Sequence, residues 1–295
     1  FENAFDMDEL SVLCLDAQVL DFDLCIDLSK QRNSPCHIIH KIGAHTKICP
    51  DADCHSLNMK ITDRLFLLAC DDVKDCAKYS TSQCDSVFLT VDGAVGYGYD
   101  AFCDDFGPLS LGSTFQFFKL IDDTMTLNLQ KSIVIKSSLE CRALTNLIFL
   151  VGSYLMMKFD TDPDEIVKCL APASDFVVSF KDVSSGPQNF HLYLRDCWAG
   201  LWRAKQLGWV QPGFDGFDAA EHAHYGSPLN ADLHEIVPGK FIAMRGPVDL
   251  PDGQLWRDAA QPDGTHRRDL SPAHCLDALR HFGVQAVVGG NPAQD

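Results

Sequence analysis

The sequence is short of basic residues. Its 295 residues include 24 Lys and Arg against 41 Asp and Glu, which gives a formal net charge of −17. Proteins that bind duplex nucleic acid neutralise its phosphates with clustered Lys and Arg, so this balance argues against a nucleic-acid partner. A basic peptide is a better match, although solubility alone explains most of the acidic residues.

Long apolar runs are also scarce. The longest, Leu144–Met157, is interrupted by Thr145, Asn146 and Ser153, and it is shorter than the roughly 20 residues that span a bilayer. We therefore interpret it as a core helix and expect no membrane partner. The first segment, Phe1–Leu28, is acidic where a secretory signal peptide would be basic, so no signal peptide is predicted.

The 13 cysteines show no regular framework, and their number is odd. Many have apolar neighbours, which favours reduced thiols in a cytosolic or nuclear protein. Cys and His are concentrated in Gln31–Asn58, where Cys49 and Cys54 are separated by four residues. No second pair completes a standard finger spacing, so a flexible loop is favoured over a zinc site, and zinc at Cys36–His55 stays open.

A strand, a turn and a helix are predicted in the middle of the chain, over Lys131–Phe159. The β-branched Ile133–Ile135 predict a buried strand, Lys136–Thr145 a polar turn, and Asn146–Met157 a helix packed on several sides. The strand-to-helix turn of many α/β enzymes holds an anion. This turn contains no glycine that would let a phosphate approach the backbone closely. The position of a nucleophile, six residues before Arg142, is occupied by Lys136, so we predict no catalysis here.

Other elements follow from local patterns. Strands are predicted at Lys60–Cys70, Val87–Val91, Val284–Val288 and on both sides of Pro238–Gly239. Four helices are predicted: one with Pro108 in its first turn, one after an N-cap at Thr161, one from Asn189 to Leu207 and one from Ser271 to His281. A linker is predicted at Gly208–Pro228 and a polar loop at Pro251–Arg268.

Two further motifs resemble catalytic signatures without meeting their requirements. Gly93, Gly96 and Gly98 have the order G-x-x-G-x-G, which is not the dinucleotide fingerprint and predicts a turn. His274-Cys275 precedes Arg280 by four intervening residues, whereas cysteine phosphatases need five, in a loop before a helix. This segment is itself predicted to be helical, so we predict that it has no catalytic role.

Six motifs together resemble one family, the Cdc-fourteen-type dual-specificity protein phosphatases. They agree in order and spacing, and the resemblance covers about residues 58–290. The motifs are ITDRLF (Ile61–Phe66), DDFGPLSL (Asp104–Leu111), FLVGSYLM (Phe149–Met156), TDPDEI (Thr161–Ile166), SFKDVS (Ser179–Ser184) and IVPGKFIAMRGP (Ile236–Pro247).

The resemblance implies an α/β fold of tandem dual-specificity-phosphatase-like domains, of which the second is incomplete. It implies an acidic, Cys- and His-rich extension at 1–57, a non-catalytic N-terminal domain at 58–188, a linker helix and linker at 189–228, and the start of a catalytic domain at 229–295. The family's catalytic Cys, Arg and Asp would follow Val284–Val288. We therefore expect a fragment without catalytic residues, inactive as given.

The parent reaction implied by the resemblance is hydrolysis of phosphoprotein monoesters through a Cys-phosphate, with no metal or cofactor. The family favours phosphoserine followed by proline with a basic residue nearby, read by an acidic groove, and Asp164 and Glu165 match its motif. The resemblance implies a location in the cytoplasm and nucleus, including the nucleolus, centrosome or spindle. Whether the protein forms a homodimer is left undecided. The alternatives are a natural pseudophosphatase that binds phosphorylated or basic peptides and a nonfunctional gene remnant.

Overall fold

The computed structural model describes residues 56–70, 85–91, 97–99, 101, 104–183, 188, 190–211, 217–260 and 266–289. The predicted Cys- and His-rich segment lies almost entirely outside them. The chain divides into two compact units, one formed by residues 36–219 and the other containing residues 220–295. The predicted domain bounds at residues 57, 188 and 228 stay predictions. The mixed α/β class is confirmed.

The first unit contains a four-stranded sheet in the order β1-β2-β4-β3. Its strands are β1 (Ser56–Lys60), β2 (Leu65–Cys70), β3 (Ser86–Thr90) and β4 (Ser132–Ser137). β1 is antiparallel to β2, and the other two pairs are parallel. The predicted strands at β3 and β4 are confirmed. The predicted strand Lys60–Cys70 is confirmed over Leu65–Cys70 and wrong over residues 61–64, where Ile61 N–H donates to the Leu65 carbonyl at 2.8 Å and closes a turn between two strands.

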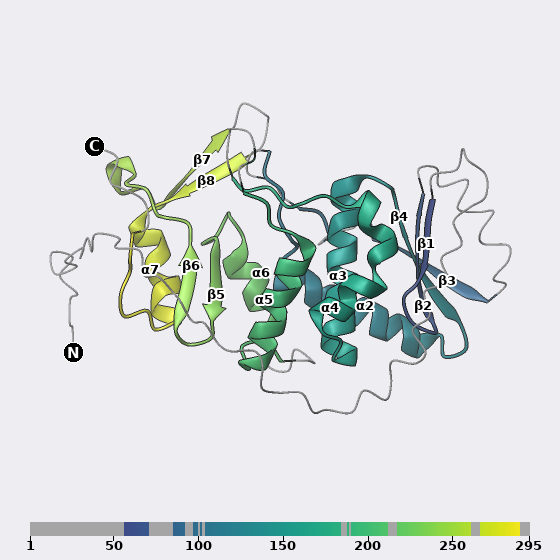
Figure 1. The fold of residues 1–295 in the computed structure, drawn as a ribbon. Coiled ribbons are helices and arrows are strands. Elements are labelled where there is room, and N and C mark those ends of the chain that lie inside the picture. The colour runs from purple at the N-terminus through teal and green to yellow at the C-terminus, as the bar shows by residue number, and fades with distance from the viewer. Residues whose placement is uncertain are drawn as a thin grey trace. The chain divides into compact units, whose positions relative to one another are not determined.

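Side chains alternate between the two faces of this sheet, as the strand period requires. Leu65, Leu67, Ile133 and Ile135 are fully buried in the main core, which the helices complete. Leu68 and Val134 point to the opposite face with a smaller apolar cluster. Figure 1 shows the helices of this unit gathered against one face of the sheet.

Those helices begin at positions set by capping. They are α2 (Leu111–Leu127), α3 (Cys141–Phe159), α4 (Pro163–Cys169), the 3-10 helix η3 (Ala171–Phe176) and α5 (Leu194–Gln206). The predicted starts differ from these. The α2 cap is Ser110, so Pro108 precedes the helix, and the α4 cap is Asp162 instead of Thr161. α5 begins after Tyr193, later than predicted.

The contact between α3 and α5 depends on a glycine. The indole of Trp198 lies against Gly152, where a Cβ atom would come within 2.4 Å of its ring carbons. Trp198 is 2% exposed, and its Nε1–H donates to the Phe149 carbonyl at 3.1 Å. At the other end of α5, Lys205 donates to the Met156 carbonyl and pairs with Asp160, which ends α3 in a left-handed conformation.

The described residues of the second unit form two hairpins, two α-helices and one 3-10 turn. They are α6 (Ala219–Gly226), β5 (Leu233–Val237), β6 (Phe241–Met244), the 3-10 turn η4 (Pro251–Gly253), β7 (Trp256–Ala260), β8 (His266–Leu270) and α7 (Pro272–His281). The predicted β5–β6 hairpin and the helix after Ser271 are confirmed. The predicted linker contains α6, and the predicted loop Pro251–Arg268 contains β7 and most of β8. The predicted strand Val284–Val288 is wrong, since this segment forms no strand and Val288 is 84% exposed.

Candidate functional site

The turn between β4 and α3 is much shorter than the sequence suggested. β4 ends at Ser137 and α3 begins at Cys141, so residues 138–140 alone connect them. A cysteine phosphatase places its Cys and Arg at the two ends of a loop whose N–H groups surround the phosphate. The connection of residues 138–140 leaves no room for such a loop.

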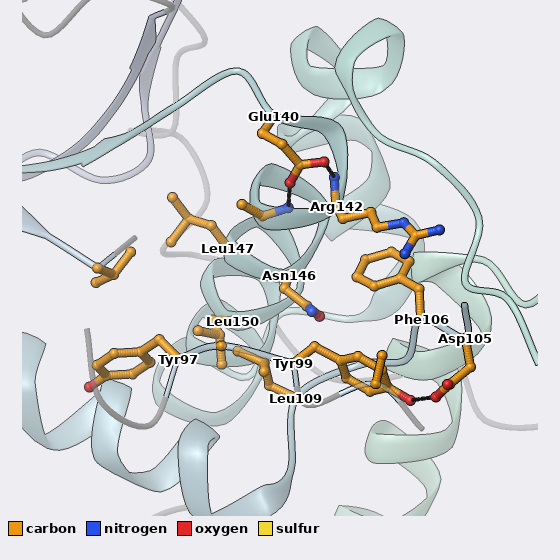
Figure 2. A pocket seen from close by; sticks show the side chains of 14 residues that line it. Tyr97, Tyr99, Asp105, Phe106, Leu109, Glu140, Arg142, Asn146, Leu147 and Leu150 are labelled. Atoms are coloured by element: carbon orange, nitrogen blue, oxygen red, sulfur yellow. Dashed lines mark hydrogen bonds between the residues drawn. The ribbon is translucent and has the colours of Figure 1, made fainter. Parts of the chain in front are cut away.

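The Glu140 side chain occupies the place at the start of α3 where an anion would bind. Both carboxylate oxygens of Glu140 accept backbone N–H groups, from Arg142 at 3.0 Å and from Ala143 at 2.6 Å (Figure 2). Free N–H groups at a helix N-terminus are what normally binds a phosphate. Because Glu140 uses two of them and adds a negative charge, this helix start disfavours a phosphate.

Arg142 is likewise directed away from the turn. Its guanidinium bonds Asp104 at 2.9 Å and lies over the ring of Phe106, 5.6 Å from the centroid. Asp104 also accepts from Lys181 at 2.7 Å. The hydrogen bonds from Lys181 and Arg142 hold the pKa of the Asp104 carboxyl below its usual value. Arg142 therefore ties α3 to the loop that precedes α2.

The second cysteine motif is part of α7. Cys275 is 1% exposed, and burial raises the pKa of its thiol, which opposes formation of the nucleophilic thiolate. Arg280 lies 3.7 Å from Asp277 on the same helix and is 62% exposed. The pair therefore has the helical geometry that the sequence predicted and does not form a phosphate loop.

Asp164 and Glu165, the residues assigned to a substrate groove, lie in the first turn of α4. The Asp162 carboxylate accepts the N–H groups of both, at 2.9 and 3.0 Å. The structure adds a partner that the sequence did not indicate. The guanidinium of Arg195, on α5, donates through Nε and Nη2 to Asp164 Oδ1 at 3.1 and 2.9 Å.

An apolar hollow of about 370 Å³ lies beside this ion pair, between α4, η3 and α5. We call it the α4–α5 hollow. Val167, Val178 and Tyr193 line it and are 39%, 40% and 56% exposed, while Trp198 closes its inner wall. Arg195 lines the hollow too, so the apolar surface adjoins the ion pair between Arg195 and Asp164. Such a combination suits a peptide with apolar and basic side chains.

Metal and membrane signals are absent from the part of the chain that the structure describes. No group of three or more His, Cys, Asp or Glu side chains is arranged to hold a metal there. None of the described helices is long and apolar enough to cross a bilayer. The possible zinc site at Cys36–His55 lies outside these residues. Cys141, Cys169, Cys197 and Cys275 are free thiols, whereas Cys70 is disulfide-bonded, so the expectation of reduced thiols is wrong at that position.

Comparison with known protein families identifies the first unit. The family model described as "Dual specificity protein phosphatase, N-terminal half" matches residues 59–204. Residues 59–204 belong to this family. The match contains β2, β3, β4, the end of β1, the helices from α2 to α4, most of α5, the closed turn at Glu140 and the α4–α5 hollow. The family resemblance and the phosphatase-like fold predicted from the sequence are thereby confirmed.

Individual relatives agree with the family match. The chain is 34% identical over 154 residues to "Dual specificity protein phosphatase CDC14C" of Symphalangus syndactylus, which covers 50% of this chain and 31% of the relative. It is 32% identical over 188 residues to "Dual specificity protein phosphatase CDC14A" of Mus musculus, covering 61% and 30%. "Tyrosine-protein phosphatase CDC14" of Saccharomyces cerevisiae is 27% identical over 175 residues, covering 57% and 30%. The matched segment thus spans about a third of each relative.

Sequence reasoning missed Glu140 and Arg195. Glu140 lies inside the predicted polar turn, and the apolar run that starts at Leu144 moved the predicted helix start past it. A carboxylate directly before a helix is a capping signal that was available in the sequence. The pairing of Arg195 with Asp164 depends on how α5 packs against α4, and no local pattern encodes that.

Proposed function

We propose that this chain supplies the substrate-recognition half of a dual-specificity protein phosphatase. The observation that supports the proposal most is the capping of α3 by Glu140, since it replaces the bound phosphate of a catalytic domain with a fixed carboxylate. A domain that keeps the phosphatase layout but has lost its anion site can still contribute a binding surface. The relatives' names describe phosphatases, and the family model that matches residues 59–204 is described as the N-terminal half of such a phosphatase.

The proposed substrates are phosphoproteins with basic residues near the phosphorylated site. Asp164 is connected to the α4–α5 hollow by its ion pair with Arg195, and Glu165 follows it in the first turn of α4. Arg195 already neutralises Asp164, so a basic peptide competes with an internal partner. Exposed ion pairs contribute only about 0.2–1 kcal/mol each, and salt screens them, so we expect weak, salt-sensitive recognition.

For the intact enzyme, we propose hydrolysis of phosphoprotein monoesters. As the resemblance implies, it would proceed through a Cys-phosphate without a metal, on residues outside 59–204. A location in cytoplasm and nucleus is proposed on the same ground. The described contacts support recognition by this chain and no chemistry at the β4–α3 turn.

Peptide binding tests the proposal. A fluorescent phosphoserine-proline peptide with nearby Lys or Arg is titrated with the 295-residue protein and with the variant Asp164→Lys plus Glu165→Lys. We expect the variant to bind roughly two- to thirtyfold more weakly. The control, Asp85→Lys plus Asp123→Lys, changes net charge equally at exposed positions of the same unit and should leave the affinity nearly unchanged. Equal affinity for all three proteins would refute the groove.

A second variant tests the competition by Arg195. Replacing it with Gln removes the internal partner of Asp164 and leaves the carboxylate available. Affinity for the basic peptide should therefore rise, by up to about fivefold. Weaker binding of Arg195→Gln would indicate instead that Arg195 itself contacts the peptide.

A further inference from the structure

A separate cavity of about 240 Å³ lies between the first turns of α3, residues 97–99 with Ala101, and residues 105–109. Figure 2 shows it from close by. Neither Asp164 nor Glu165 lines it, so it takes no part in the groove proposed above. Sites for drug-sized ligands usually measure roughly 300–1,000 Å³. This cavity therefore fits a single small ring system and not a nucleotide.

One polar atom in the cavity wall has no partner. Asn146 is 4% exposed, and its Nδ2 donates to the Gly107 carbonyl at 3.2 Å. Its Oδ1 is buried and accepts no hydrogen bond from the described residues. The amide orientation is fixed, since the Gly107 carbonyl can only accept. Buried polar atoms are nearly always paired, so Oδ1 indicates a missing donor.

Figure 2 shows where that donor would lie. The amide of Asn146 extends from α3 toward the rings of Phe106 and Tyr99. Those two rings meet edge to face, with centroids 5.9 Å apart. Tyr97 provides a third aromatic wall and packs edge-on against Phe117. Aromatic walls of this kind favour contact with the flat ring of a ligand.

The charged groups around the cavity already have hydrogen-bond partners within the protein. Glu140 binds two backbone N–H groups, and Arg142 binds Asp104. The buried carboxylate of Asp105 accepts from the Tyr99 hydroxyl at 2.6 Å. The carboxylates of Glu140 and Asp105 would repel an anion. A cation would have to compete with the hydrogen bonds that both carboxylates already accept. The ligand is therefore neutral.

We propose that this cavity binds a neutral aromatic ring that carries one N–H or O–H donor, of the size of indole or phenol, with the donor on Asn146 Oδ1. Two sources share this chemistry: a free small molecule and the Trp or Tyr side chain of a protein segment. Both present a flat ring and a single donor at its edge.

Matched probes test the hydrogen bond. Indole and benzofuran have nearly the same shape, but only indole has an N–H donor. In ligand-observed NMR titrations of the 295-residue protein, we expect indole to bind about tenfold more tightly than benzofuran. Asn146→Leu should abolish that preference. Equal affinities for the two probes, or no binding of either up to the solubility limit, would overturn the proposal and indicate a cavity filled by water.

A cavity-filling variant keeps the test valid if Asn146→Leu fails to fold. Ala143 lines the cavity from α3, and Ala143→Leu should remove indole binding while the melting temperature is kept or raised. Unchanged indole binding in this variant would place the ligand elsewhere and refute the site. N-acetyl-tryptophanamide separates the sources: affinity equal to indole or higher indicates a protein side chain, and binding of indole alone indicates a small molecule.

Discussion

Gly152→Ala is the substitution whose effect the structure determines most closely. The added Cβ would lie 2.4 Å from Cε2 and Cζ2 of Trp198, far inside the roughly 3.5–4.0 Å at which carbon atoms attract. Overpacking of this kind costs about 1–3 kcal/mol. Displacing the indole also loses its hydrogen bond to Phe149, about 1 kcal/mol, which the helix preference of Ala over Gly roughly offsets. The expected net loss is about 1–3 kcal/mol.

Gly200→Ala is the matched control. Gly200 lies on the exposed side of α5, with open space around the position of its Cβ, so Ala should stabilise the helix by about 0.5–1 kcal/mol. Urea unfolding followed by Trp fluorescence reports both variants, because Trp198 and Trp202 lie on α5. The midpoint should fall for Gly152→Ala and rise for Gly200→Ala. A Gly152→Ala protein as stable as the parent would refute the packing of Trp198 on α3.

Three further outcomes are expected. Glu140→Ala should lower the free energy of unfolding by about 1 kcal/mol in urea titrations, because α3 loses its N-cap, and an unchanged midpoint would contradict that role. Asp104→Asn should reduce the loss of stability as pH falls below about 5. A carboxyl with a lowered folded-state pKa stabilises the fold above its unfolded pKa, and this contribution disappears as pH falls through the folded value; urea midpoints at successively lower pH measure it. Iodoacetamide should label exposed Cys141 well before Cys197, where burial and then Asp196 raise the thiol pKa to about 12, and mass spectrometry showing the reverse order would contradict that burial.

Strong local patterns predicted much of the fold. The β-branched run at Ile133–Ile135 and the Ser271-Pro272 start of α7 both appear where expected, because residues adjacent in the sequence signal each of them, and β4 also finds β2 and β3 to pair with. The predicted strand Val284–Val288 failed although its apolar residues fit one, because in this structure no neighbouring strand pairs with it. The β7–β8 hairpin was missed because its residues are polar, and strand pairing outweighs their weak local preference.

The candidate sites depended more on contacts between distant residues. Asp164 was identified through a motif, but its partner Arg195 lies 31 residues later and becomes visible only when α5 packs on α4. Asn146 looked like an interruption of an apolar run, and the structure makes it the polar group of a cavity. Its significance comes from the partner that Oδ1 lacks, which no sequence pattern can reveal.

Phosphate release from a phosphoserine-proline peptide tests the central claim most directly. The claim is that this chain recognises the peptide at the α4–α5 hollow, whereas the β4–α3 turn, closed by Glu140, carries out no hydrolysis. The 295-residue protein should release no phosphate above the blank at peptide concentrations where it binds, and Cys141→Ser should behave identically. Vanadate-sensitive release that Cys141→Ser abolishes would contradict the account, because it would make the first residue of α3 a nucleophile.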